Sequence, residues 1–190
     1  MNRTARRRPT ASELVRHVWL GRIEAEYRSA AITQHLCLWL IQVGASPDLI
    51  RLGLRIVDDE LKHAELSRKV WLAAGGHGAP TLDQTALGLR REYDALEHDV
   101  LMAIVRVFCL GETVAVPLFA NLRKHTTVNV AERAYDRILK DEVRHRDFGW
   151  LALGWLLERP DASVLRAMVE SRLPSFLAAL ERSYGEDLEH

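Results

Sequence analysis

The feature that most constrains the fold is a short motif that occurs twice within helical sequence. Residues 58–63 read DDELKH and residues 140–145 read KDEVRH, so a glutamate precedes a histidine by three residues in each. Residues three apart share a helix face, and neighbours on that face are mostly apolar or small. A buried carboxylate costs on the order of several kcal/mol unless it is paired or binds a metal. The fold must therefore supply a partner for these acids.

Helical periodicity extends over most of the chain, and we find no alternating β-branched run and no Asn-Gly hairpin signal. Thr10 or Ser12 is expected to cap the first helix, and Ser46-Pro47 to begin the second. Short links near 44–47 and 125–129 predict two antiparallel hairpins, and hence an all-α, antiparallel four-helix bundle with an additional C-terminal helix. The predicted helices are about 12–43, 47–74, 82–124, 130–157 and 162–184.

Two parts of this assignment stay open. The segment 82–95 is polar, so the third helix begins later than Leu82 or consists of two pieces. Pro174 is expected to perturb the last helix. The chain of 190 residues suits one domain with a sizeable core. We divide it into a flexible basic tail at 1–11, the bundle at 12–157, a C-terminal helix packed on it at 158–187, and an expression-tag remnant at 188–190.

Composition narrows the class of protein. The formal net charge is zero, so no global field recruits nucleic acid or an anionic membrane. No apolar run reaches the ~20 residues of a membrane span, and no apolar segment typical of a signal peptide precedes Ser12. Cys37 and Cys109 are isolated and are expected to be reduced core residues of a cytoplasmic protein. The arginines at 3, 6, 7 and 8 are expected to be a frayed tail, with a targeting or docking signal as the alternative.

The other two bundle helices each carry one acid on an apolar face, Glu26 in the first and Glu112 in the third. Glu24 competes with Glu26, but its own face is more polar and typical of a solvated surface. Counted from the helix links, the depths of the four acids differ by no more than about 6 Å at a rise of ~1.5 Å per residue. Four carboxylates and two imidazoles in one layer are the set that holds two metal ions in a bundle.

The residue types also indicate which metal they bind. Imidazole and carboxylate suit iron or manganese, and four carboxylates balance two divalent cations. Asp59 and Asp141 are expected to accept an N–H from the histidine of the facing helix, with Lys62 and Arg144 balancing these aspartates. The alternative is a set of ion pairs that binds no metal. The predicted metal ligands are Glu26, Glu60, His63, Glu112, Glu142 and His145.

Four segments, EYRS at 26–29, DDELKH at 58–63, GET at 111–113 and DEVRH at 141–145, resemble the ferritin-like superfamily of dimetal carboxylate proteins. The resemblance covers about residues 12–157 and implies a non-haem di-iron centre, or manganese with iron, at the six positions above. The Asp-Glu-x-base-His form is more similar to the oxygenase and oxidase branches than to ferritin itself. Lys62 stands where arginine is usual, and lysine lacks the planar fork of arginine.

The resemblance implies an oxidoreductase that activates O2 on a small organic substrate and takes electrons from an external donor. No catalytic residue beyond the dimetal centre is assigned, and no organic cofactor is expected. A ferroxidase or iron-storage protein is the alternative, although storage needs a cage and we see no acid-rich entry route. A metal-free helical partner protein leaves the paired motifs unexplained. Apolar surface on the first or the fifth helix offers a route to a homodimer.

Two features near Glu112 bear on the enzyme hypothesis. Phe108, Cys109, Val116 and Phe119 either line an apolar pocket or pack in the core. Pro117 leaves the carbonyl of residue 113 without its helical N–H partner, which predicts a kink or bulge one turn past Glu112.

Overall fold

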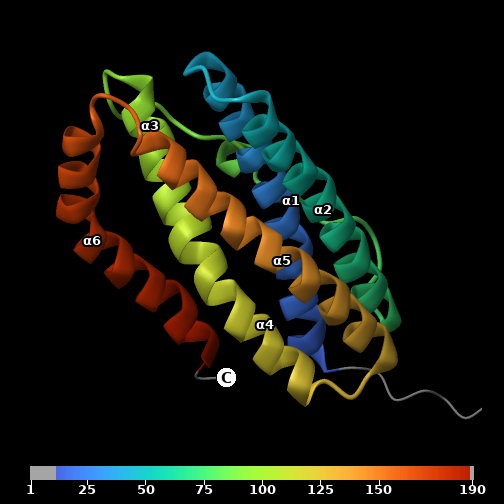
Figure 1. Ribbon diagram of the computed structural model, residues 1–190. Coiled ribbons are helices and arrows are strands. Elements are labelled where there is room, and N and C mark those ends of the chain that lie inside the picture. The colour runs from blue at the N-terminus through green and yellow to red at the C-terminus, as the bar shows by residue number, and fades with distance from the viewer. Residues whose placement is uncertain (1–11, 189–190) are drawn as a thin grey trace, which may run out of the picture.

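The computed structural model describes residues 12–188, with side chains up to residue 183, and this range is all-helical without strands. The described helices form five rods, whose arrangement Figure 1 shows. The third rod is compound, because α3, the π-helical segment η2 and α4 follow each other without a break. A 3-10 turn, η1 (Gln84–Ala86), lies in the connection before it. The rods are α1 (Glu13–Gln42), α2 (Pro47–Ala73), α3 (Leu96–Ala103) with η2 (Ile104–Glu112) and α4 (Thr113–His125), α5 (Asn129–Leu156) and α6 (Ala162–Leu188).

The first two rods begin at the residues that the sequence marks. The Ser12 hydroxyl accepts the Val15 N–H, and the Ser46 hydroxyl accepts the Leu49 N–H, each at 3.3 Å. These serine caps satisfy amide groups that have no partner within the helix. Between the two rods, Gly44 has a φ of +78°, a left-handed conformation that glycine adopts without a steric penalty. The short link therefore turns α2 back along α1.

The rods lie side by side, and α2 and α5 are in contact as the two hairpins pack together (Figure 1). One apolar cluster occupies one end of the rods and includes Leu40, Ile56 and Phe108. A second apolar cluster occupies the other end and includes Ile23, Val70 and Ile138. On each of the four rods, the predicted acidic ligand lies between residues of the first cluster and residues of the second. The candidate site is thus a polar layer between two apolar ones.

The third rod begins at Leu96. The prediction of a start near Leu82 is therefore wrong, and the alternative prediction of a later start is confirmed. The polar segment before it is an ordered connection held by Asp99. One Asp99 oxygen accepts the N–H groups of Glu92 and Tyr93 at 2.7 and 3.3 Å, and the other accepts Arg91 Nε at 2.7 Å. Side-chain bonds to the backbone compete with helix here.

The expected distortion of the third rod lies before Glu112, within η2, and not one turn past it. Pro117 falls inside α4, which resumes regular helical geometry at Thr113. Next to η2, a Cβ added at Gly149 of α5 would lie 2.6 Å from the Phe108 Cβ and 2.8 Å from the Phe108 carbonyl carbon. Because only glycine permits this approach, α5 packs directly on the π-helical backbone that carries Glu112.

The side chains around Glu112 pack in the core. Phe108, Cys109 and Phe119 are all buried, and the Phe108 ring meets the Phe148 ring edge-on at 5.0 Å. Cys37 and Cys109 are buried and unpaired as predicted, and burial raises the pKa of these thiols to about 11 and about 12. These contacts favour the core interpretation of these residues over the pocket interpretation.

The last rod, α6, flanks α3 and η2 (Figure 1) and covers the first apolar cluster through the fully buried Leu165. It runs through Pro174, so the predicted perturbation does not end the helix. Glu170, whose carbonyl loses its N–H partner to the proline, lies on the exposed side of α6, where water can replace that bond. The arginine-rich tail and residues 189–190 lie outside the described residues.

By length and composition, the third rod, Leu96–His125, is apolar enough to cross a membrane, contrary to the sequence expectation. Buried helices of soluble proteins pass the same test. In this structure Val100, Leu101, Ile104 and Phe108 are fully buried against the other rods. Core packing accounts for the apolar character of these four residues, and 44% of the apolar window is buried.

Candidate metal centre

The structure brings all six predicted ligands together in the polar layer. Side-chain ligand atoms within 4.8 Å of one another form two groups. Glu26, Glu60, His63 and Glu142 form one group, and Glu60, Glu112 and His145 form the other. The competing acid Glu24 belongs to neither group. Each rod of the bundle contributes at least one member, as the matched helix depths predict.

Two carboxylates lie between the two histidines and face both of them. The Glu60 oxygens lie 3.4 Å from His63 Nδ1 and 3.4 Å from His145 Nδ1, one oxygen to each ring. The Glu142 oxygens lie 3.6 Å from His63 Nδ1 and 3.3 Å from His145 Nδ1, again one to each. The ring centroids are 5.6 Å apart. The Nδ1 atom of each imidazole therefore faces one oxygen of each carboxylate.

The atoms that point into this layer lack partners. His63 Nδ1, His145 Nδ1, Glu60 Oε2 and Glu142 Oε2 are buried and make no hydrogen bond. Buried polar groups are almost always satisfied in folded proteins, so four unsatisfied atoms within one small volume need an explanation. Metal ions held by the two groups of ligand atoms would satisfy them.

Crowding of carboxylates perturbs the acids at the two ends of the layer. Burial raises the pKa of Glu26 well above its ordinary value, and the Glu60 and Glu142 carboxylates raise it further. Burial and the Glu142 carboxylate likewise raise the pKa of Glu112. This pattern is expected where negative charges share a site of low polarity. The layer without a metal therefore favours added positive charge.

The imidazoles respond in the opposite direction. Burial alone lowers the pKa of His145, but Asp59, Glu142 and Glu60 reverse this and raise it to about 12. Burial likewise lowers the pKa of His63, and the Glu60 and Glu142 carboxylates reverse the effect so that the pKa is raised. A proton and a metal ion compete for Nδ1, so the Glu60 and Glu142 carboxylates that raise these pKa values would also attract a cation.

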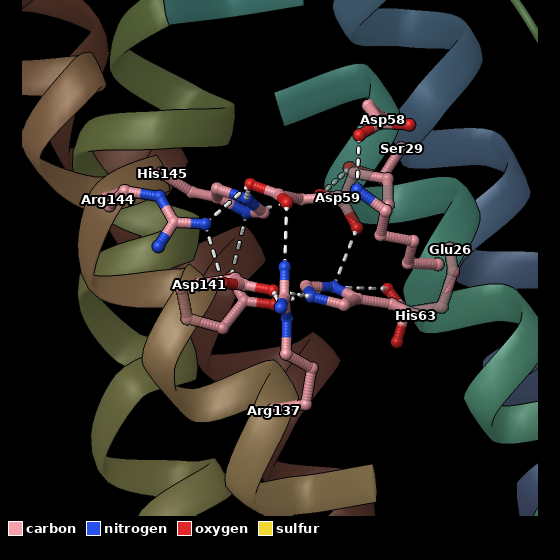
Figure 2. Close-up of polar contacts among 12 residues, drawn as sticks. Glu26, Ser29, Asp58, Asp59, His63, Arg137, Asp141, Arg144 and His145 are labelled. Atoms are coloured by element: carbon pink, nitrogen blue, oxygen red, sulfur yellow. Dashed lines mark hydrogen bonds and ion pairs between the residues drawn. The ribbon is translucent and has the colours of Figure 1, made fainter. Parts of the chain in front are cut away.

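The outer nitrogens of the rings meet the two predicted aspartates (Figure 2). His63 Nε2, on α2, lies 3.2 Å from Asp141 Oδ2, on α5. His145 Nε2, on α5, lies 3.7 Å from Asp59 Oδ2, on α2. Each aspartate thus faces the histidine of the opposite rod. At hydrogen-bond distance, the Asp141 contact favours the His63 tautomer with the proton on Nε2 and leaves Nδ1 free for a metal, whereas His145 Nε2 makes no hydrogen bond.

One of the two predicted bases takes the expected place. Arg144 donates to Asp59 Oδ2 at 2.7 Å and to Asp141 Oδ1 at 2.6 Å. The prediction for Lys62 is wrong: its ammonium pairs with Asp58, four residues earlier on the exposed side of α2. The physical reason is that Lys62 points away from the layer, and a partner lies closer to it on the helix surface.

Sequence reasoning missed two residues that contact the cluster. Arg137 donates to Asp141 Oδ2 at 2.5 Å and to Asp59 Oδ1 at 3.3 Å. Its position four residues before Asp141 was the available signal, because such pairs share a helix face. Ser29 donates its hydroxyl to Glu60 Oε1 at 2.7 Å, across from α1 to α2. No sequence signal marks that contact, since it depends on helix packing.

Arg22, one helical turn before Glu26, occupies an aromatic box in the second apolar cluster. Its guanidinium carbon lies 5.4 Å from the Trp19 ring centroid, 4.7 Å from Phe119 and 5.4 Å from Tyr135. Its positive charge partly offsets the rise in the pKa of Glu26. Cation–π contacts of this kind stabilise a guanidinium that has little access to water.

Two hollows lie on the described surface, outside the layer. One, of about 240 Å³, lies between α1, α2 and the connection that carries Leu82 and Leu87. The other, of about 120 Å³, is lined in part by Asp59 and Arg144. Neither includes Phe108, Cys109, Val116 or Phe119, the residues expected to line an apolar pocket.

Comparison with known proteins gives no relative: no family model, no curated protein and no solved structure matches this chain.

Proposed function

We propose that this protein is a non-haem di-iron oxidoreductase of ferritin-like architecture that activates O2 on a small organic substrate. One observation carries the proposal: Glu60 and Glu142 each direct one oxygen to His63 Nδ1 and the other to His145 Nδ1, at 3.3–3.6 Å. Two carboxylates that bridge two imidazole positions are the donor arrangement of a two-cation site.

The end ligands complete two unequal positions. Glu26 adds its carboxylate at the His63 position, and Glu112 adds its carboxylate at the His145 position. Four carboxylates carry four negative charges, which two divalent cations balance. Without such cations the layer would have to bind protons instead, as the raised pKa values of Glu26, Glu112 and the two histidines indicate. The donor set therefore fits two cations better than one.

Mixed oxygen and nitrogen donors favour iron, and manganese with iron is the related option. When bound, a pair of iron ions supplies redox chemistry toward O2. The chain itself holds the ligands in one layer, and the apolar clusters on both sides keep water away from it. Asp141 lies at hydrogen-bond distance from the outer nitrogen of His63 and orients that ring, and Asp59 faces the outer nitrogen of His145 at 3.7 Å.

The architecture supports the same proposal. The rods α1, α2, the third rod and α5 correspond to a bundle in which two helices give one glutamate each and two give Glu-x-x-His. The sequence segments that resemble the ferritin-like superfamily are the segments that meet in this layer. The partners of the reaction, namely the substrate, O2 and an external electron donor, and its cytoplasmic setting are parts of this proposal.

Anaerobic Fe(II) titration of chelator-free protein, followed by elemental analysis, tests the proposal. We expect saturation near two irons per chain, and faster O2 consumption once a substrate is supplied. Uptake of many more irons in air would instead indicate a ferroxidase or storage protein. Binding of no iron would contradict both functions.

Substitution of the histidines tests the ligand assignment directly. We expect His63→Ala and His145→Ala each to lower iron occupancy by about one ion per chain, because each removes the only nitrogen donor of one position. His77→Ala, in the exposed loop after α2, is the matched control and should bind iron like the unchanged protein. Unaltered occupancy in both site variants would rule out these ligands.

A further inference from the structure

We propose that Arg137 is a positioning residue of the metal centre, one that fixes Asp141 and through it the His63 ring. This inference rests on the proposed dimetal site. It assigns to Arg137 the role that the sequence resemblance leads one to expect of the base at position 62. The two arginines that stabilise the aspartates then both come from α5, and none comes from α2.

The contact of Arg137 is with the oxygen that orients the histidine. Its Nε lies 2.5 Å from Asp141 Oδ2, and that same oxygen lies 3.2 Å from His63 Nε2. A carboxylate held on one side by a guanidinium cannot rotate freely away from the imidazole on the other. Since the opposite ring nitrogen, Nδ1, faces the metal position, the guanidinium controls the direction in which Nδ1 points.

The two arginines divide the four aspartate oxygens between them (Figure 2). Arg144 bonds Asp59 Oδ2 and Asp141 Oδ1, whereas Arg137 bonds Asp59 Oδ1 and Asp141 Oδ2. Every oxygen of the two carboxylates therefore receives one guanidinium nitrogen. Arg137 spans the two carboxylates with two different nitrogens, Nε and Nη2, a fork that an ammonium group lacks, whereas Arg144 reaches both carboxylates through Nη2 alone.

Lys62 does not take part in this arrangement. Its side chain is 47% exposed and pairs with Asp58, whose side chain is 66% exposed. Two solvent-exposed charges contribute little to stability or to a buried site. The sequence departure at position 62 is thus compensated by a residue on another rod.

The charges of the four glutamates, the two aspartates and the two arginines agree with this role. The four glutamates and two aspartates carry six negative charges, and the two arginines carry two positive charges. Two divalent cations supply the remaining four, so the whole cluster is neutral when both histidines are neutral. Removing Arg137 leaves Arg144 alone to balance the charges of both aspartates.

Co(II) titration of the metal-free protein, followed by visible absorption, tests this inference, because it measures binding without any catalytic assay. We expect Arg137→Gln to weaken one of the two Co(II) positions about tenfold and to leave the other nearly unchanged. Arg137→Lys should restore part of the loss, since it keeps the charge but not the fork. The guanidinium is exposed enough, at 43% for the side chain, for substitution to leave the core intact.

Two control variants separate positioning from general stability. Arg133→Gln changes an exposed arginine one turn earlier on α5 and should bind Co(II) normally. Lys62→Gln should also bind normally. The inference is overturned if Arg137→Gln binds both ions like the unchanged protein, if both positions weaken equally along with a lower melting temperature, or if Lys62→Gln is as damaging. If the unchanged protein binds no pair of ions, the proposed function fails instead.

Discussion

The two Glu-x-x-His motifs are nearly identical in sequence, yet they form unequal halves of the centre. In the His63 half, the end ligand Glu26 is buried and comes from a regular α-helix. In the His145 half, the end ligand Glu112 is only partly buried and comes from the end of a π-helix. By exposed area, Glu112 is therefore the less buried of the two end ligands.

The outer contacts differ as well. The aspartate that faces His63 lies at 3.2 Å, whereas the one that faces His145 lies at 3.7 Å, beyond a hydrogen bond. Of the two shared carboxylates, Glu60 accepts the Ser29 hydroxyl through Oε1, the oxygen that faces His145, while Oε2 of both Glu60 and Glu142 has no partner. The surroundings of a motif come from other helices, so repeated sequence does not give repeated environment. We infer that two cations bound at the proposed site would differ in affinity, with the His63 position the tighter.

The largest effect is expected from a carboxylate that both halves share. Glu142 serves both halves, so Glu142→Ala should abolish binding of both cations, whereas Glu112→Ala should weaken mainly the His145 half. Metal content after dialysis against Fe(II) or Co(II) measures this difference. Glu24→Ala, the acid that competes with Glu26 in the sequence, is the matched control. Retention of one tightly bound ion by Glu142→Ala would show that the carboxylate is not shared.

A substitution at Gly149 tests the close packing of α5 on the π-helical segment η2, next to the His145 half. Gly149→Ala should destabilise the protein by about 1–3 kcal/mol, because the new Cβ would overlap Phe108 and the Cys109 backbone nitrogen. Gly154→Ala, on the same helix with open space around it, should instead stabilise by about 0.5–1 kcal/mol. Thermal unfolding of the metal-free variants compares the two. Equal melting temperatures would contradict the close approach of α5 to the π-helix.

A smaller effect is expected from the hydrogen bond that Ser29 donates to Glu60, one of the two shared carboxylates. Ser29→Ala removes the hydroxyl that donates to Glu60 and should cost about 1 kcal/mol in cation binding, a several-fold loss of affinity. Ser67→Ala removes a buried hydroxyl without a hydrogen-bond partner, and its cation affinity should be unchanged. Calorimetric titration with Co(II) measures both. A larger loss for Ser67→Ala than for Ser29→Ala would reverse the assignment.

Much of the fold follows from local pattern. The bounds of α1, α2 and α5 agree with prediction to within about two residues, because caps such as Ser12 and Ser46 act locally. The start of the third rod was misplaced, since the bonds of Asp99 to the preceding backbone involve residues outside the periodic pattern. The π-helical turns of η2 were placed on the wrong side of Glu112, because they depend on contact with Gly149 of another helix.

The sequence by itself determined that four helices each bring an acid to a common depth, with a histidine three residues after two of them. Helical periodicity and equal distance from the turns are enough for that result. Only the tertiary structure decided which base joins Asp141, that Ser29 meets Glu60, and that the two halves differ. Those contacts run between helices, where the rotation and approach of one rod on another, and not the order of residues along either, set which side chains meet.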